Sequence, residues 1–216
     1  MNDYNLHQYL ENEVHLSCEN LERRDRIFET IQNAIIIWSK QSTGGETSLI
    51  LKPFGSVLLG SELKTSDLDL IVVAPSIFSR EYFFSTFTPF LTSQFSSGSL
   101  SISNLHVISN AFTPVIKFFV NGEVSVDLIF ARMSISSIPS EIDLLDDSLL
   151  ENMSDVDLRC LNGLRVSEYL ITHLGDCCEL GEFQDALRVV KMWAVGRGVY
   201  SPILGFFSGV LFSFFN

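Results

Sequence analysis

Three aspartates stand at spacings that suit the binding of a divalent cation. Asp67 and Asp69 are two residues apart at the start of an apolar, β-branched run, DLDLIVVAP. Side chains alternate between the two faces of a strand, so both carboxylates point to the same face and repel each other unless a cation lies between them. Magnesium prefers carboxylate, water and phosphate oxygens. Surface turns also produce such pairs often, so the pair predicts a metal site only in combination with other residues.

The dipeptide Gly55-Ser56 lies upstream of this pair, in a turn that opens toward a helix. A glycine lets the backbone approach a phosphate closely, and the serine adds a hydroxyl and an amide donor. The alternative interpretation of the dipeptide alone is an ordinary turn.

A third aspartate, Asp127, interrupts the strand-like run EVSVDLIF. It shares one face of that strand with Ser125 and Ile129. The opposite face carries apolar side chains: Val124, Val126, Leu128 and Phe130. Burying a carboxylate in an apolar strand is costly unless it is paired or bound to a metal. The alternative is a polar position on a solvated sheet face.

The elements that would position these residues follow from hydrophobic periodicity. Asn20 to Lys40 has the spacing of an amphipathic helix, and LILKPF and DLDLIVVAP are typical of strands. Residues 79–95 are predicted to be helical, and SQFSSGSLSISN is predicted to be a loop or a hairpin end. Asn121-Gly122 between TPVIKFFV and EVSVDLIFARM is a strong hairpin signal. Three further segments are predicted to be helices: LLDDSLLENM, VDLRCLNGLRVSEYLITHL and EFQDALRVVKMWAVGRG.

Composition argues against a dedicated, basic nucleic-acid-binding protein. The chain has 216 residues and a net charge of -12, from 14 Lys and Arg against 26 Asp and Glu. Any attraction to RNA must therefore come from bound cations, a local patch or a part of the protein outside this sequence.

The four cysteines lack metal-binding spacing and fit free thiols. The uncharged segment from Val199 to Asn216 is interrupted by Pro202, Gly205 and Gly209, which favours a buried helical hairpin over a membrane anchor.

The combination of Gly-Ser, D-x-D and a third aspartate on a later hairpin strand resembles the polymerase-β-type nucleotidyltransferase superfamily. Longer blocks resemble the eukaryotic nuclear poly(A) polymerase core from about Leu21 to Val210: FGSVLLGSELKTSDLDLIVVAP, FTPVIKFFVNGEVSVDLIFARM, LLDDSLLENM, LRCLNGLRV and LRVVKMWAVGRGVYSPILGFFSGV. The resemblance implies an α+β fold, with a nucleotidyltransferase palm (a mixed sheet with flanking helices) followed by an incomplete helical central domain. It places an N-terminal helical segment that packs with the central domain at residues 1–42, the catalytic domain at 43–150 and a partial central domain at 151–216. It also implies that the chain is C-terminally truncated and lacks the family's RNA-binding domain.

The resemblance also assigns roles to single residues. Asp67, Asp69 and Asp127 would bind two Mg²⁺ or Mn²⁺ ions and carry catalysis. The remaining assignments concern the substrate ATP: Phe54, Gly55 and Ser56 for the nucleotide and its triphosphate, Asn162 for the adenine, Lys191 and Tyr200 for phosphates and sugar, and Gly209 and Val210 for the base pocket. On physical grounds alone, Lys191 would be a solvated helix lysine and Tyr200 a core aromatic.

The implied activity is transfer of AMP from ATP to the 3′ end of mRNA in the nucleus, with cleavage and polyadenylation factors as partners and no membrane. Several positions depart from the family pattern: Val57, Leu58, Leu63, Val195, Gly196 and Pro202. These changes reduce polar or positive character around the triphosphate, so ATP affinity is the property that they affect. Two alternatives stay open: a catalytically inactive binding or regulatory remnant, and a glycosyltransferase that uses D-x-D to hold a nucleotide sugar. Uridylyl and other terminal transferases share the three aspartates, so the choice of base rests on the resemblance.

Overall fold

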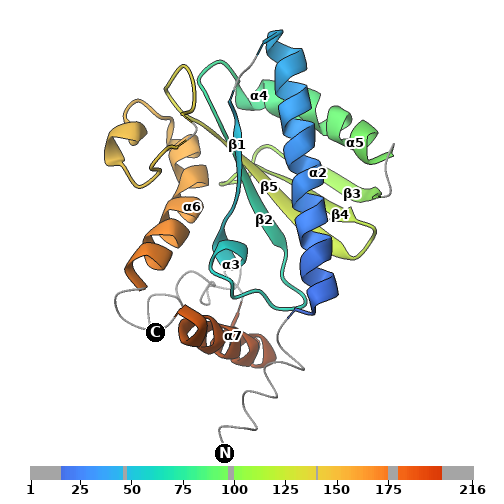
Figure 1. Cartoon of the computed structure of the whole chain (residues 1–216), viewed down its shortest axis with the longest axis vertical. Coiled ribbons are helices and arrows are strands. Elements are labelled where there is room, and N and C mark those ends of the chain that lie inside the picture. Colours follow the sequence, from blue (N-terminus) through green and yellow to red (C-terminus); the bar gives the residue numbers. More distant parts are fainter. Residues whose placement is uncertain (1–15, 46–47, 97–99, 140, 175–179, 201–216) are drawn as a thin grey trace, which may run out of the picture.

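The computed structural model describes residues 16–45, 48–96, 100–139, 141–174 and 180–200. Its strands form one mixed sheet: β1 (Ile50–Pro53), β2 (Leu68–Ala74), β3 (Ile102–Ile108), β4 (Val115–Val120) and β5 (Val124–Arg132). Its helical elements are α2 (Cys18–Thr43), α3 (Gly55–Leu58), α4 (Arg80–Tyr82), the π-helical turn η2 (Phe83–Phe87), α5 (Thr88–Ser96), the 3₁₀ turn η3 (Asp147–Leu150), α6 (Asp155–Leu174) and α7 (Leu180–Gly196). Figure 1 shows α2 and α5 on one side of β2, and α6 on the other.

The strand order is β1-β2-β5-β4-β3, in which β2 and β5 are parallel and the other neighbours are antiparallel. The predicted hairpin joins β4 to β5: Asn121 and Gly122 adopt positive φ angles of 53° and 70°, and Val120 pairs with Val124. Left-handed backbone at both positions is what Asn-Gly tolerates best. The hairpin fixes the register of β4 on β5, and this register decides which side chain lies opposite Asp127.

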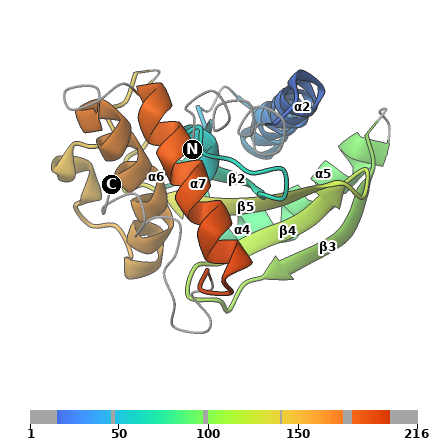
Figure 2. The ribbon, with the colours of Figure 1, turned by 90° about the horizontal axis from the view of Figure 1, so that it is seen from below.

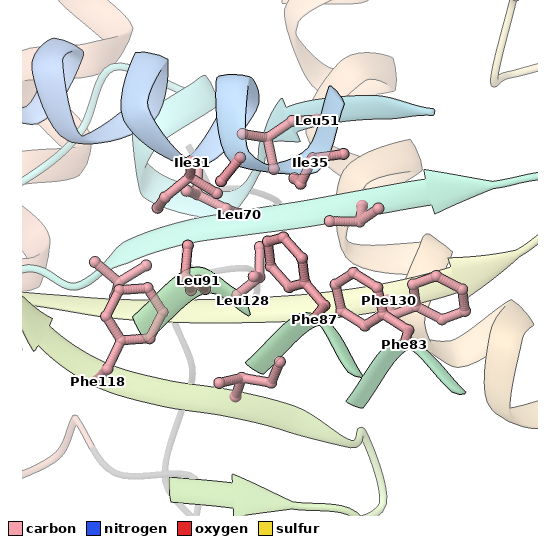
Figure 3. Packing of buried hydrophobic residues seen from close by; sticks show 14 of the residues in the cluster. Ile31, Ile35, Leu51, Leu70, Phe83, Phe87, Leu91, Phe118, Leu128 and Phe130 are labelled. Carbon is pink, nitrogen blue, oxygen red and sulfur yellow. The ribbon is translucent and has the colours of Figure 1, made fainter. Parts of the chain in front are cut away.

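Helix α2 covers one face of the sheet. Ser17 caps its start by accepting a hydrogen bond from the backbone N–H of Asn20, and Gly44 ends it in the left-handed conformation. Its apolar stripe, which includes Ile31 and Ile35, packs with the sheet side chains, with the aromatic residues of η2 and with Leu91 of α5 (Figure 3). The described part of the segment at residues 1–42 buries its apolar stripe on the sheet, because the stripe matches the apolar face of β2 and β5.

The opposite face of the sheet is covered by α6 and the segment that follows β5. Ile71, Val73 and Ile129 pack there against Leu161 and Leu164 of α6. A smaller cluster, which includes Leu59, Leu170 and Leu187, joins α7 to α6 and to the end of α3. Figure 2 shows α7 passing beside α6 at the end of the sheet where α3 lies. The two helices therefore flank the turn that carries Gly55.

Two local predictions are wrong. Residues 93–104 were expected to form a loop or hairpin end, but α5 continues to Ser96 and β3 begins at Ile102. The polar side chains of β3 fit an exposed edge strand and hide the apolar alternation on which strand prediction depends. The predicted helix LLDDSLLENM forms only the turn η3, because the carboxylate of Asp143 accepts from the N–H of Leu145 and that of Asp146 from the N–H of Ser148.

Candidate active site

The turn between β1 and β2 brings main chain against a catalytic candidate. The N–H of Phe54 donates to the carbonyl of Asp69 at 3.1 Å, and the chain then turns through Gly55, whose φ is +60°. A Cβ atom at Gly55 would lie 3.2 Å from Oδ2 of Asp69. Glycine is thus favoured here both by backbone conformation and by the close approach of a carboxylate.

Asp69 and Asp127 are direct neighbours across the parallel strands β2 and β5. Their side chains share the sheet face that carries Ile71 and Ile129, while Leu68, Leu70, Val126 and Leu128 face α2. Asp67 precedes β2 and is exposed. The sheet register therefore places Asp69 and Asp127 side by side on one face of the sheet.

The surroundings of these aspartates disfavour negative charge. Burial, followed by the charges of Asp127 and Asp67, raises the pKa of Asp69 to about 7. Burial also raises the pKa of Asp127, although the Lys117 ammonium opposes that shift. Carboxyl groups held in this way gain stability from any cation that binds between them.

Lys117 of β4 forms an ion pair with Oδ2 of Asp127. It lies directly opposite Asp127 in the antiparallel register of β4 and β5. The other carboxylate oxygen, Oδ1, is buried and has no hydrogen-bond partner within the described residues. A buried carboxylate oxygen normally has a partner, so Oδ1 is an acceptor available to a ligand.

A cleft of about 340 Å³ opens beside Asp69. It is lined by most of the residues that were expected to bind the nucleotide: Phe54, Gly55, Ser56, Asp67, Asp69, Lys191 and Tyr200. Gly163 of α6 also lines it, and a Cβ there would meet the Phe54 ring at 3.2 Å. The fold therefore gathers into one cleft residues that are far apart in the sequence.

Lys191 of α7 is buried, with 5% of its surface exposed. Its ammonium donates to the carbonyl of Ser61 at 3.1 Å. Burial lowers its pKa to about 8, against the opposing charges of Asp69 and Glu62. Lys191 is thus not the solvated lysine expected on physical grounds, because α7 packs this face of the helix on the loop before β2.

Other predicted residues lie elsewhere. Asn162 is exposed and is not among the cleft-lining residues; its neighbour Gly163 takes that position. Asp127 lies next to Asp69 in the sheet without lining the cleft itself. Gly209 and Val210, expected in the base pocket, lie outside the described residues.

The aspartates fit divalent cations by the chemistry of their donors. Across the described ranges, no three His, Cys, Asp or Glu side chains converge closely enough to hold a metal ion as a group. The carboxylates of Asp69 and Asp127 are nonetheless in register, their pKa values are raised, and Oδ1 of Asp127 lacks a partner among the described atoms. Oxygen donors of this kind suit Mg²⁺ or Mn²⁺.

Sequence reasoning missed Lys117 and the residues that hold the Gly55 turn. The hairpin signal at Asn121-Gly122 could have located Lys117, because pairing Val120 with Val124 puts residue 117 opposite residue 127. The hydroxyl of Ser167 on α6 accepts from the N–H of Gly55 at 3.0 Å. No local sequence signal connects these two residues, since only the packing of α6 brings them together.

Comparison with known proteins assigns the family. A family model for the poly(A) polymerase nucleotidyltransferase domain matches residues 3–174, and one for the poly(A) polymerase central domain matches residues 182–215. The chain belongs to the poly(A) polymerase family. The family inferred from the sequence motifs is thereby confirmed.

Curated members of the family align over most of this chain. The chain is 32% identical over 204 residues to the poly(A) polymerase of Dictyostelium discoideum, and 40% identical over 157 residues to poly(A) polymerase PAPa of Candida albicans. These alignments cover 90% and 73% of this chain but only 24% and 27% of the two relatives. The chain thus spans about a quarter of the length of these relatives.

Solved structures confirm the fold class. The polymerase core of TRAMP, an RNA surveillance complex, aligns with a TM-score of 0.63 at 18% identity over 97% of this chain and 52% of that one. The Cid1 poly(U) polymerase aligns with a TM-score of 0.63 at 18% identity over 99% of this chain and 54% of that one. The mixed sheet with flanking helices is therefore the nucleotidyltransferase palm that the resemblance implied. Among the helices that the structure describes, none is both long and apolar enough to cross a membrane.

Proposed function

We propose that this chain transfers AMP from ATP to the 3′ end of RNA, as a polynucleotide adenylyltransferase. The observation that supports the proposal most directly is the placement of Asp69 and Asp127 side by side, next to a cleft formed by the Gly55 turn and Lys191. Family membership supports the reaction class, and identity to poly(A) polymerases supports ATP as the donor.

Asp67, Asp69 and Asp127 would hold the divalent ions, Mg²⁺ or Mn²⁺. Two such ions would lower the pKa of the attacking 3′-hydroxyl and neutralise the triphosphate and the departing pyrophosphate. The protein's contribution is to keep the carboxylates adjacent by the β2–β5 register and to provide Oδ1 of Asp127 as an acceptor without a partner in the described structure.

The remaining cleft residues would bind and orient the nucleotide. At Gly55 the absent Cβ leaves main chain exposed beside Asp69, so the phosphates can approach both. The ammonium of Lys191 would neutralise phosphate charge, and its burial reduces the screening of that charge by water. Tyr200 and Gly163 line the same cleft and are positioned to contact the sugar or base.

The wider role that we propose is polyadenylation of pre-mRNA in the nucleus, together with cleavage and polyadenylation factors. We also propose the division into an N-terminal segment (1–42), a catalytic domain (43–150) and a central-domain portion (151–216). Family membership supports the reaction class behind this role, while the nuclear setting and the protein factors follow only from the resemblance of the sequence. The family model for the nucleotidyltransferase domain spans residues 3–174, across the proposed boundaries at 42 and 150.

Primer extension tests the proposed reaction. The purified chain should add adenosine to a labelled RNA primer in the presence of ATP and Mg²⁺, and ATP should outcompete UTP, GTP and CTP. Asp127→Asn should abolish this addition, whereas Asp155→Asn, a control at an exposed aspartate of α6, should not. Addition that persists in Asp127→Asn would refute the metal assignment. Equal use of UTP would assign the chain to a broader class of terminal transferases.

The second candidate is a non-catalytic binding or regulatory protein with the same palm. The ion pair between Lys117 and Asp127 favours it, because this cation already neutralises a carboxylate that catalysis would give to a metal. Binding of ATP without any primer extension under Mg²⁺ or Mn²⁺ would support this candidate over the enzyme.

A further inference from the structure

The loop between α3 and β2 carries much of the wall of the cleft. Ser61, Leu63, Thr65, Ser66 and Asp67 all line the cleft. The loop has internal hydrogen bonds, such as that from the N–H of Leu63 to the hydroxyl of Ser66 at 2.9 Å, but it forms no helix or strand. Side chains of neighbouring elements also form hydrogen bonds with it.

Arg24 of α2 donates hydrogen bonds to this loop at two points. One guanidinium nitrogen donates to Oε1 of Glu62 at 2.7 Å, and the other donates to the carbonyl of Ser66 at 2.5 Å. Arg24 is 7% exposed and Glu62 is 9% exposed. A planar guanidinium can make both bonds at fixed angles, which a lysine cannot. Ser66 immediately precedes Asp67, so the hydrogen bond from Arg24 to Ser66 lies next to a proposed metal-binding carboxylate.

Glu62 also faces cations of α7. Burial raises the pKa of Glu62, and the charges of Arg24, Lys191 and Arg188 oppose that shift. On the same side, Lys191 donates to the carbonyl of Ser61, and Arg188 donates to the carbonyl of Gly60. Glu62 thus lies between the cation of α2 and the cations of α7, and its negative charge limits their mutual repulsion around the loop.

We propose that Arg24 and Glu62 are positioning residues for nucleotide binding: their ion pair fixes the 60–67 loop, and thereby sets Ser61, Ser66 and Asp67 at the cleft. The proposal rests on the proposed function of the cleft. Neither residue is expected to touch ATP, since neither lines the cleft. Through this pair, helix α2 becomes part of the support of the active site as well as of the core.

The chain contains a matched control one residue away. Arg23 lies on the same helix and also forms ion pairs, with Glu123 and Glu19, but these partners are outside the 60–67 loop and are 59% and 77% exposed at their side chains. Replacing Arg23 by Met removes the same charge and the same side-chain type, and the ion pairs that it removes are with Glu19 and Glu123 and not with the loop. Comparing the two variants thus separates the effect of losing a positive charge on α2 from the effect of losing the hydrogen bonds to the 60–67 loop.

The experiment compares Arg24→Met, Arg24→Lys, Glu62→Gln and Arg23→Met with the unchanged chain. Equilibrium titration with ATP and Mg²⁺ gives Kd, and primer extension gives KM and kcat, with thermal unfolding of each variant as the check on folding. We expect Arg24→Met to raise both Kd and KM for ATP about ten-fold with a smaller change in kcat. Arg24→Lys should recover part of the loss, and Arg23→Met should match the unchanged chain.

The experiment distinguishes failure of the positioning role from failure of the proposed function. If Arg24→Met does not fold, the other two variants test the same proposal. Glu62→Gln preserves the shape of the side chain and Arg24→Lys preserves its charge, and we expect each of them to raise the Kd for ATP. Unchanged Kd and KM in the folded variants, or an equal rise in Arg23→Met, would overturn the proposal. If the unchanged chain binds ATP but extends no primer, the proposed function fails, while the Kd series still tests the positioning role.

Discussion

Replacing Asp69 by Asn should stabilise the metal-free protein at neutral and alkaline pH. The pKa of Asp69 is raised to about 7 from its ordinary value of 3.8, first by burial and then by the charges of Asp127 and Asp67. Between these two pH values the folded chain keeps a proton that the unfolded chain has lost. The free energy of unfolding therefore falls as pH rises from about 4 to about 7, and is level above that range as far as this group is concerned.

The size of the effect follows from the same two values. Each pH unit between the folded and unfolded pKa corresponds to about 1.4 kcal/mol, and the gap is about three units, so the limit is about 4 kcal/mol. Side-chain rotation toward water reduces this amount, and we expect a gain of about 1 to 3 kcal/mol at pH 8. In a chain of this length, each kcal/mol raises Tm by about 2 to 4 °C.

Urea unfolding in EDTA measures the difference directly. The unchanged chain and Asp69→Asn should have nearly equal free energies of unfolding at pH 4, and the variant should be more stable at pH 8. Saturating Mg²⁺ should then stabilise the unchanged chain, because an ion that binds only the folded state shifts the equilibrium toward it. The variant should gain much less from Mg²⁺.

The reasoning is refuted if Asp69→Asn is no more stable than the unchanged chain at pH 8, or if its gain is as large at pH 4. The first result would mean that Asp69 is not held as an unfavourable charge. The second would mean that the gain comes from packing, which does not depend on pH. Asp155→Asn, at an exposed position, is the control for removal of a carboxylate elsewhere.

Three further changes test other parts of the site and fold. Gly55→Ala should destabilise the chain by about 1 to 3 kcal/mol in urea unfolding and weaken ATP binding, because φ is +60° and the new Cβ would lie 3.2 Å from Oδ2 of Asp69; wild-type stability would contradict the turn geometry. The KM for ATP should rise above pH 8 as Lys191, whose pKa is about 8, loses its charge, and Lys191→Arg should remove this rise; a pH-independent KM would exclude the ammonium from phosphate binding. Trp38→Ala should cost about 3 to 5 kcal/mol of unfolding free energy, because its ring is buried among Phe78, Phe83 and Phe87; a smaller loss would indicate that this aromatic cluster can collapse.

The parts of the fold that could be predicted from the sequence are those with strong local signals. The amphipathic stripe of α2, the β-branched run of β2 and the Asn-Gly turn each specify their own element, and all three are present. The strand β3 lacked such a signal, because it lies at the sheet edge and carries exposed polar side chains such as His106. Local side-chain hydrogen bonds at Asp143 and Asp146 likewise replaced a predicted helix by a short turn.

The site shows the same division between local and tertiary information. That Asp127 lies on the strand face opposite Val126 and Leu128 follows from alternation, but its adjacency to Asp69 requires the pairing of β2 with β5, which are separated by about fifty residues. Lys191 shows the limit most clearly. A lysine on a helix is most often solvated, and only the packing of α7 on the loop before β2 makes this one buried.

Net charge was the weakest guide to function, and the site explains why. A chain with a net charge of -12 has no basic footprint as a whole, yet Arg24, Arg188 and Lys191 gather around the loop at the cleft, and Lys117 lies beside Asp127. The electrostatic field that a bound triphosphate experiences is set by the nearest groups, since solvent screens exposed charges beyond about 8 to 10 Å. Partly buried cations near the cleft are screened less than the exposed carboxylates elsewhere on the chain. An acidic chain can therefore place a buried ammonium at the wall of a cleft, as Lys191 shows, because the fold, and not the composition, decides where its few lysines and arginines lie.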